Sequence, residues 1–214
     1  MTQNSDKGLS RKHKKALERV LFADHSGLEK DEAELKLNTF VLIDAAKNEG
    51  IPYYLDGFEA EYASLLNLGE SKKLSSVAPY LVRLEPSSTV TDWFLSHLYG
   101  KGAGFAFQTR QSLEAMRVHW KNQFRSKMPG SDEKGFFRFY DPEILRSYLS
   151  ILDEKDDNAL SKFINHCECF LVESNDKKVL LRYWKKSEDD NTLSNKEICL
   201  DDESNVEQVK QSIA

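Results

Sequence analysis

Cysteine and long apolar runs are scarce in this sequence. There are three cysteines among 214 residues, and Cys167 and Cys169 are separated by a single residue, so a disulfide framework is not expected. No run approaches the roughly eighteen apolar residues that a bilayer span requires, and the N-terminus lacks the apolar core of a signal peptide. We therefore expect a cytoplasmic protein in a reducing compartment, without membrane insertion.

An excess of positive charge is also lacking. The sequence has 30 Lys and Arg against 35 Asp and Glu, and its pI is near 5.6. This balance gives no general attraction to nucleic acid, and we expect no nucleic-acid partner. Basic residues do cluster near the N-terminus, ahead of apolar residues at helical spacing; the cluster comprises Arg11, Lys12, Lys14 and Lys15. This pattern predicts an amphipathic helix whose charges are either merely solvated or dock an acidic partner.

What the sequence does contain is enough apolar material for one sizeable core, at 40% hydrophobic and 11% aromatic residues. We expect one domain over residues 38–186, preceded by an N-terminal extension with the basic helix over 1–37. Residues 187–214 carry eight Asp or Glu against two Lys. They are expected to form an acidic, mobile tail with at most one marginal strand at 197–200.

Strand and helix patterns alternate along the middle of the chain. Strands are predicted at 39–46, 53–57, 78–86 and 105–108, and a β-hairpin at 169–173 and 179–184. Helices are predicted in between, including one over 58–66. The alternation predicts an α/β fold with a mixed, largely parallel sheet, flanked by helices and closed by a C-terminal β-hairpin.

The most distinctive stretch is the aromatic run at 136–140. Four of its five residues are aromatic, which predicts a largely buried strand. Asp141 and Pro142 follow as a helix cap and a first helical residue, so the strand should lead directly into a helix.

Carboxylates at predicted strand ends are the main candidates for chemistry. They are Asp44, Asp56, Glu85 and Asp141. Such a set could hold a metal ion or act as acid and base in a metal-dependent hydrolase. Each of the last three also has a local use, because Asp56 precedes a turn glycine, Glu85 precedes a proline and Asp141 caps a helix.

Other motifs are weaker. The cluster His166-Cys167-Glu168-Cys169 lacks the ligand spacing of a zinc site. The glycine-rich segment 100–104 resembles a phosphate loop but precedes a strand, so we interpret it as a bend. No Gly-x-Ser-x-Gly elbow is present. We expect no metal, no cofactor and no enzymatic activity.

Four segments carry a family resemblance. Residues 40–46, 54–57, 78–85 and 137–146 resemble, in order, the successive signatures of the bacterial type VI secretion adaptor-chaperone family. The resemblance spans about residues 38–184. It implies a protein without enzymatic activity that binds a toxic effector in the cytoplasm and loads it onto the spike protein VgrG.

An adaptor needs exposed aromatic side chains where its partner binds. The candidates are Tyr53, Tyr54, Trp93, Tyr99 and Trp120. Trp93 and Trp120 lie at helical spacing and could instead belong to the core. Tyr99 adjoins flexible glycines, and Tyr53 and Tyr54 cannot share one face of a strand, so these three are expected to be partly exposed.

Arginines and acids recur close together along the matching segments. We expect at least one partly buried ion pair among Arg83, Glu85, Arg138, Asp141 and Arg146. Such a pair would tie neighbouring units of the fold together, and loss of one partner would lower stability.

Overall fold

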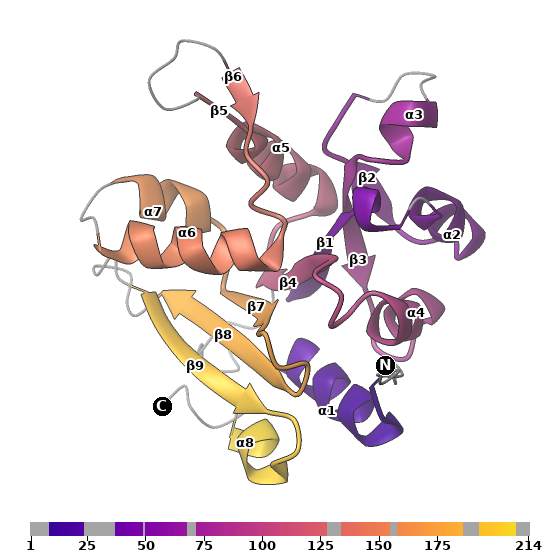
Figure 1. Ribbon diagram of the computed structural model, residues 1–214, viewed down its shortest axis with the longest axis vertical. Helices are drawn as coiled ribbons and strands as arrows, with labels where there is room; N and C mark the ends of the chain where they lie inside the picture. The colour runs from indigo at the N-terminus through magenta and orange to yellow at the C-terminus, as the bar shows by residue number, and fades with distance from the viewer. Residues whose placement is uncertain are drawn as a thin grey trace, which may run out of the picture.

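The protein has three layers, with one large sheet between two layers of helices (Figure 1). The computed structural model describes residues 9–23, 37–48, 50–67, 72–127, 134–154, 158–185 and 193–208. The large sheet has seven strands in the order β2–β3–β1–β4–β7–β8–β9. Their bounds are β2 Tyr62–Ser64, β3 Pro79–Leu84, β1 Asn38–Asp44, β4 Gly104–Thr109, β7 Cys169–Glu173, β8 Val179–Lys185 and β9 Leu193–Cys199. A separate two-stranded ribbon consists of β5 (Arg125–Lys127) and β6 (Lys134–Phe136).

Every pair of neighbouring strands in the sheet is antiparallel, so the expectation of a largely parallel sheet is wrong. β3 and β4 do run in the same direction, as strands joined through a helix often do, but β1 lies between them and is antiparallel to both. The alternation of strands and helices along the sequence does not reveal that an earlier strand lies between two later ones. The apolar run of β1 correctly indicated burial on both faces, which here occurs in an antiparallel sheet.

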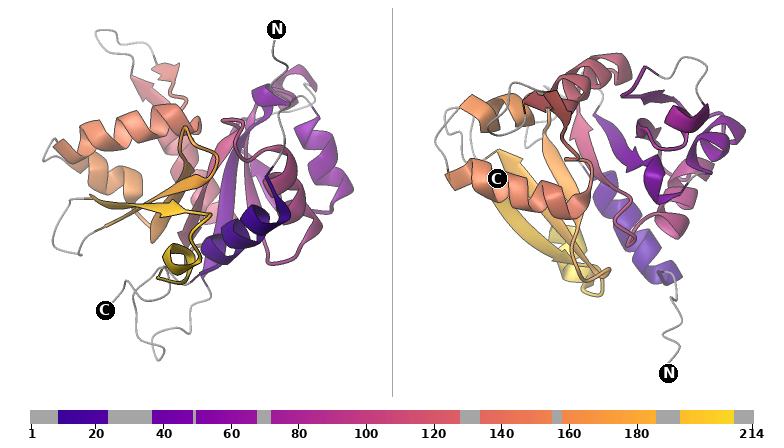
Figure 2. Two further views of the ribbon diagram at one scale, coloured as in Figure 1. Left: turned by 60° about the horizontal axis from the view of Figure 1, so that its bottom comes forward. Right: turned by 45° about the horizontal axis from the view of Figure 1, so that its top comes forward.

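The two faces of the sheet are covered by different helices (Figures 1 and 2). The first face packs against α1 (Arg11–Leu21), α2 (Ile51–Gly57), α4 (Thr89–His97) and α8 (Glu203–Gln208). The second face packs against α5 (Leu113–Phe124), α6 (Pro142–Glu154) and α7 (Asn158–Ile164). Alternation along β1 serves both faces, since Val41 and Ile43 belong to the first core and Phe40 and Leu42 to the second. Short helical turns are also present at η2 (Ala45–Lys47) and α3 (Lys72–Ser75).

The segment after Gly50 differs from the sequence prediction. Residues 53–57 were expected to form a strand but lie in α2, which begins with Pro52 in its first turn. Ile51 and Leu55, four residues apart, are both fully buried, and this contact with the core outweighs the strand preference of the tyrosines. The helix expected over 58–66 is absent, because β2 forms there and pairs with β3.

The aromatic run at 136–140 is only partly a strand. β6 ends at Phe136, and the following residues cross to the second core, where Phe139 and Tyr140 are buried. Phe139 stacks on Trp120 with ring centroids 5.2 Å apart. The helix start was predicted correctly, since α6 begins at Pro142 and the Asp141 carboxylate accepts a hydrogen bond from the Glu143 N–H at 3.0 Å.

Both ends of the described chain pack on the sheet. The C-terminal hairpin of β7 and β8 is confirmed, and β9 extends it as the edge strand, reaching the marginal strand expected at 197–200. α1 and α8 contribute Leu17, Val20 and Val206 to the first core. The division into 1–37, 38–186 and 187–214 stays a prediction.

None of the described helices is both long and apolar enough to span a membrane.

Gly104 provides a test of the sheet centre. A β-carbon at this position would lie 2.0 Å from the carbonyl oxygen of Leu42 on β1, so we expect Gly104→Ala to lower the free energy of unfolding by about 3 kcal/mol or more. Gly57→Ala is the matched control, because apart from its chain neighbours and the backbone of its own helix no atom lies within 4 Å of the added carbon. The control should change stability by less than about 1 kcal/mol. Urea unfolding measures both, and equal stability of the two variants would contradict the close approach of β1 and β4.

Candidate protein-binding surface

Four aromatic side chains form one cluster where α2 lies beside α4. Tyr53, Tyr54 and Phe58 come from α2 and its end, and Trp93 comes from α4. The Tyr54 ring lies 5.5 Å from Trp93 and 6.2 Å from Phe58, and Tyr53 meets Tyr54 edge-on at 6.0 Å, all between centroids. We call these four residues the aromatic platform.

The platform is exposed on its outer side and anchored on its inner side. The exposed fraction is 79% for Tyr53 and 41% for Tyr54, whereas Trp93 is 6% exposed and belongs to the first core. The Tyr54 ring lies over Gly50, where a β-carbon would come within 2.9 Å of its Cε2 atom. The Tyr54 and Trp93 rings are therefore held by packing before any partner arrives, whereas Tyr53 stands mostly in solvent.

A groove with acidic walls adjoins Phe58. It has a volume of about 420 Å³ and lies between the segments that lead into β2 and into α4. Glu59, Glu61 and Glu85 line it, together with Arg83. We call it the acidic groove. Its negative charge exceeds its positive charge, so a basic segment fits it electrostatically.

Two non-glycine residues beside this groove have left-handed backbones. Glu59 has φ 52° and Ser87 has φ 57°, a region that L residues enter at a cost. The Ser87 N–H donates to the Glu18 carboxylate of α1 at 2.7 Å, which holds that turn. One wall of the acidic groove, at Ser87, is thus held by a hydrogen bond to α1.

The remaining aromatic candidates lie elsewhere. Trp120 is fully buried in the second core, on the other side of the sheet from the platform. Tyr99 is partly buried, and burial raises the pKa of its hydroxyl well above the ordinary value. The structure therefore brings together Tyr53, Tyr54 and Trp93, but neither Tyr99 nor Trp120. Phe58 was missed, although its spacing of four from Tyr54 would have revealed it on a correctly assigned helix.

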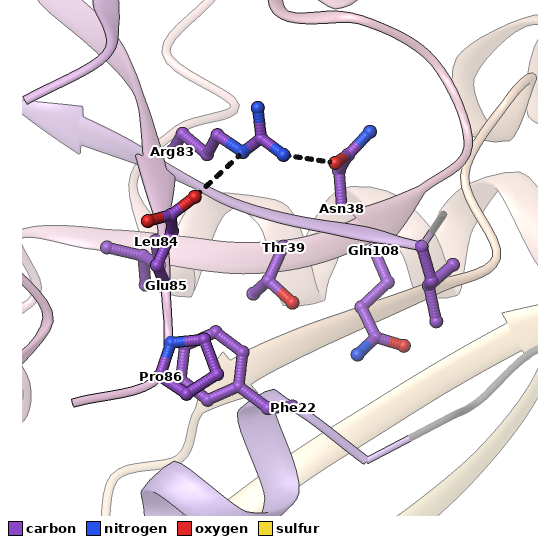
Figure 3. Close-up of a pocket in the computed structure, with 9 residues that line it drawn as sticks. Phe22, Asn38, Thr39, Arg83, Leu84, Glu85, Pro86 and Gln108 are labelled. Atoms are coloured by element: carbon purple, nitrogen blue, oxygen red, sulfur yellow. Dashed lines mark hydrogen bonds and ion pairs between the residues drawn. The ribbon is translucent and has the colours of Figure 1, made fainter. Parts of the chain in front are cut away.

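Arg83 and Glu85 lie at one side of the pocket shown in Figure 3. Arg83 contacts Glu85 at 3.8 Å, Glu61 at 2.9 Å and the Asn38 side-chain oxygen at 2.8 Å. Glu85 and Glu61 are more than half exposed, so these pairs are solvent-screened. Of the two carboxylates that Arg83 contacts, Glu61 is closer than Glu85.

The pocket of Figure 3 has a volume of about 450 Å³. Its polar side chains Thr39 and Gln108 make hydrogen bonds within the protein. The buried amide of Gln108 donates to the carbonyl oxygens of Leu21 and Ala23 at 2.9 and 2.7 Å. The Thr39 hydroxyl donates to the Leu21 carbonyl at 3.0 Å. These bonds attach the end of α1 to the sheet, which is the role we assign to them.

Arg138 pairs with Asp44 rather than with Asp141. Its Nη2 lies 2.7 Å from an Asp44 carboxylate oxygen, and the hydrogen bond to Asp44 raises the pKa of Arg138. The side-chain exposures are 48% for Arg138 and 1% for Asp44. Asp141 contacts Lys47 at 3.5 Å instead.

Arg146 and the glycine-rich segment meet at Glu173. Arg146 donates to the Glu173 carbonyl oxygen at 2.5 Å, while the Glu173 carboxylate accepts the N–H groups of Gly100 and Gly102. Both glycines have positive φ, at 76° and 64°, which lets their N–H groups converge. The segment that resembles a phosphate loop therefore binds a carboxylate of β7.

Of the four carboxylates predicted at strand ends, Asp44 ends β1 and Glu85 follows β3, whereas Asp56 lies in α2 and Asp141 precedes α6. Each has a separate contact. Asp56 accepts a hydrogen bond from the Tyr62 hydroxyl. The pKa of Tyr62 is raised to about 12, mainly by burial and secondly by this hydrogen bond. Asp44, Glu85 and Asp141 contact Arg138, Arg83 and Lys47 as described above. Within the described residues, no group of three or more His, Cys, Asp or Glu is placed to hold a metal ion. The three cysteines are free thiols.

The Arg138–Asp44 contact can be tested by a double-mutant cycle. Arg138→Ala leaves a buried carboxylate with the Ala46 N–H as its remaining described donor, so we expect a loss of about 1–3 kcal/mol in the free energy of unfolding. Asp44→Asn and the double variant complete the cycle. Urea unfolding should give a coupling energy of about 1–2 kcal/mol. Strictly additive effects would show that the pair contributes nothing.

Glu173 predicts a pH dependence of stability. Burial raises the pKa of Glu173 above its ordinary value of 4.5, although the N–H groups of Gly100 and Gly102 act to lower it. The folded protein then holds this proton more tightly than the unfolded chain, so stability falls as pH rises from 4.5 through the raised pKa.

Glu173→Gln removes this titration. Urea unfolding between about pH 4 and pH 7 should show the wild type losing stability relative to the variant as pH rises. Parallel curves for the two proteins would contradict the assignment.

Comparison with known proteins adds the family. A family model described as a domain of unknown function (DUF4123) matches residues 39–159, more than half of the chain. No curated protein and no solved structure matches the chain. The matched region runs from β1 into α7 and includes all four residues of the aromatic platform. The chain belongs to the DUF4123 family.

Proposed function

We propose that this protein is an adaptor that binds a toxic effector in the bacterial cytoplasm and loads it onto the type VI spike protein VgrG. Membership of the DUF4123 family supports the class of function, because that family is associated with adaptors of type VI effectors. The observation that carries the proposal on this chain is the aromatic platform, whose outermost ring, Tyr53, is 79% exposed.

The platform has the composition of an interface centre. Tyr and Trp side chains give large contact areas at low entropic cost, and they dominate the energetics of many interfaces. The Tyr54 ring packs against Trp93 and Phe58. The Tyr54 side chain is therefore already ordered and loses little conformational entropy when a partner binds. We therefore place the effector contact on Tyr53 and Tyr54.

The acidic groove next to the platform defines the chemistry of the bound segment. Glu59, Glu61 and Glu85 offer carboxylates within the same recess as Phe58. A segment with an apolar or aromatic residue followed by Lys or Arg would place its ring on the platform and its charge in the groove. We propose that the effector presents such a segment.

The adaptor acts by binding alone in this proposal. The four carboxylates predicted at strand ends have the contacts described above, and two of them also cap helices: Asp44 caps η2 and Asp141 caps α6. Effector capture and transfer to VgrG require two contacts and no chemical step, so no catalytic role is assigned to any residue.

Alanine at Tyr53 and Tyr54 tests the platform. We expect Tyr53→Ala plus Tyr54→Ala to weaken binding of the effector encoded beside this gene by about 2 kcal/mol in total, measured by calorimetry with the purified pair. Tyr53→Ala alone should leave the melting temperature nearly unchanged, because Tyr53 is mostly outside the core, whereas Tyr54→Ala also removes packing against Trp93 and Phe58 and should lower it. Val118→Ala plus Ile151→Ala is the matched control, since these residues are 51% and 50% exposed on α5 and α6.

Two results would overturn the proposal. Equal binding by the tyrosine variant and the control would place the effector contact elsewhere. If deletion of the gene left secretion of that effector unchanged, the adaptor function itself would be wrong.

A further inference from the structure

The pocket of Figure 3 adjoins the acidic groove. Arg83 and Glu85 line both recesses, and they contact each other at 3.8 Å. Phe58 in turn belongs to both the acidic groove and the aromatic platform. The platform, the groove and the pocket are therefore three neighbouring surfaces, each of which shares a residue with the next.

The pocket has apolar surface that a partner can reach. Pro86 is exposed, and Phe22 and Leu37 are partly exposed. Leu84 also lines the pocket, but it is 2% exposed and adds little accessible surface. Figure 3 shows the Phe22 and Pro86 rings at the opposite end of the pocket from Arg83. An apolar side chain in this pocket would bury accessible carbon of three residues.

The uncharged polar side chains of the pocket already have partners within the protein. Thr39 and Gln108 donate to carbonyl oxygens at the end of α1, as described above. The Asn38 amide donates to the Gln111 carbonyl oxygen at 3.0 Å and accepts from Arg83 at 2.8 Å. A polar occupant would lose hydrogen bonds to water without gaining these donors, whereas an apolar occupant has none to lose.

The two recesses differ in charge. The acidic groove has three carboxylates against the one guanidinium of Arg83, whereas the pocket has Arg83 and one carboxylate, that of Glu85. Arg83 lies 2.9 Å from Glu61 and 3.8 Å from Glu85, so its charge is matched where the recesses meet. A basic residue is therefore favoured in the groove and a neutral residue in the pocket.

We propose that the pocket of Figure 3 binds a large apolar side chain of the effector, on the far side of the basic residue that the acidic groove holds. The effector segment then carries three features in order: an aromatic or apolar residue for the platform, Lys or Arg for the groove, and a second apolar residue for the pocket. A volume of about 450 Å³ has room for one such side chain. This inference rests on the function proposed above and extends it, because it defines more of the bound segment.

Photo-crosslinking tests whether one segment spans the platform and the pocket. The photoreactive residue benzoylphenylalanine is placed at position Tyr53 or at position Leu37, and each protein is irradiated with the effector encoded beside this gene. Mass spectrometry should map both crosslinks to one stretch of the effector, with a Lys or Arg between the two sites. The same residue at Val118, which is 51% exposed on α5, is the control and should give no crosslink in that stretch.

Removal of apolar surface from the pocket tests its contribution to binding. Leu37→Ser should weaken binding of the effector about tenfold in calorimetry, because an apolar contact is lost. Val118→Ser removes a similar side chain from α5 and should bind within about twofold of the wild type. If Leu37→Ser fails to fold, Pro86→Ser makes the same comparison at an exposed position.

A labelled peptide that covers the crosslinked stretch separates the pocket from the groove. Replacing its second apolar residue by Ser should weaken binding to the wild type about tenfold in fluorescence anisotropy. On Leu37→Ser the same replacement should cost less than about threefold, because the contact is already lost. Replacing its Lys or Arg by Gln should weaken binding by the same factor on both proteins.

The outcomes distinguish this inference from the proposed function. If Tyr53→Ala weakens binding of the effector and Leu37→Ser does not, the effector contacts the platform alone and the role of the pocket is wrong. If neither variant weakens binding, the proposed contact surface is wrong as well. If light scattering shows a dimer for the wild type and a monomer for Leu37→Ser, the pocket belongs to a contact between two copies of this chain.

Discussion

Asp44 joins three parts of the chain, through its backbone N–H and its carboxylate: the end of β1, the entry of β4 and the segment before α6. Its backbone N–H donates to the Ala103 carbonyl at 2.8 Å, and its side chain accepts from the Ala46 N–H and pairs with Arg138. β1 is thereby held to the entry of β4 and to the segment that leads into α6. A buried charge that satisfies several partners at once fixes their relative positions more sharply than apolar packing alone.

Features encoded over a few residues could be predicted from the sequence. The β7–β8 hairpin and the start of α6 at Pro142 were recognised because turn and cap residues act locally. Strand order and direction could not be predicted, because the insertion of β1 between β3 and β4 depends on pairings across the chain. α2 was read as a strand because its tyrosines favour strands, whereas the burial of Ile51 and Leu55 decides the outcome.

The same distinction applies to the candidate site. Exposure of Tyr53 and Tyr54 was expected because neighbouring residues of a strand point to opposite faces. Neighbouring residues of a helix also point in different directions, so the expectation did not depend on the strand. Trp120 is a core residue, which was the alternative that its helical spacing left open. The partner of Arg138 lies 94 residues away, so no local pattern could identify it as Asp44. The acidic groove was missed because its walls come from two segments that meet only in the folded protein.

The central position of β1 has a consequence for how the protein is made. Among the described strands β1 comes first in the chain, but its partners end at Leu84 and Thr109. Until both have left the ribosome, a largely apolar strand has two unpaired edges, which can pair with other chains. Contacts between distant residues also form slowly. The yield of folded protein therefore depends on how soon β3 and β4 enclose the strand that preceded them.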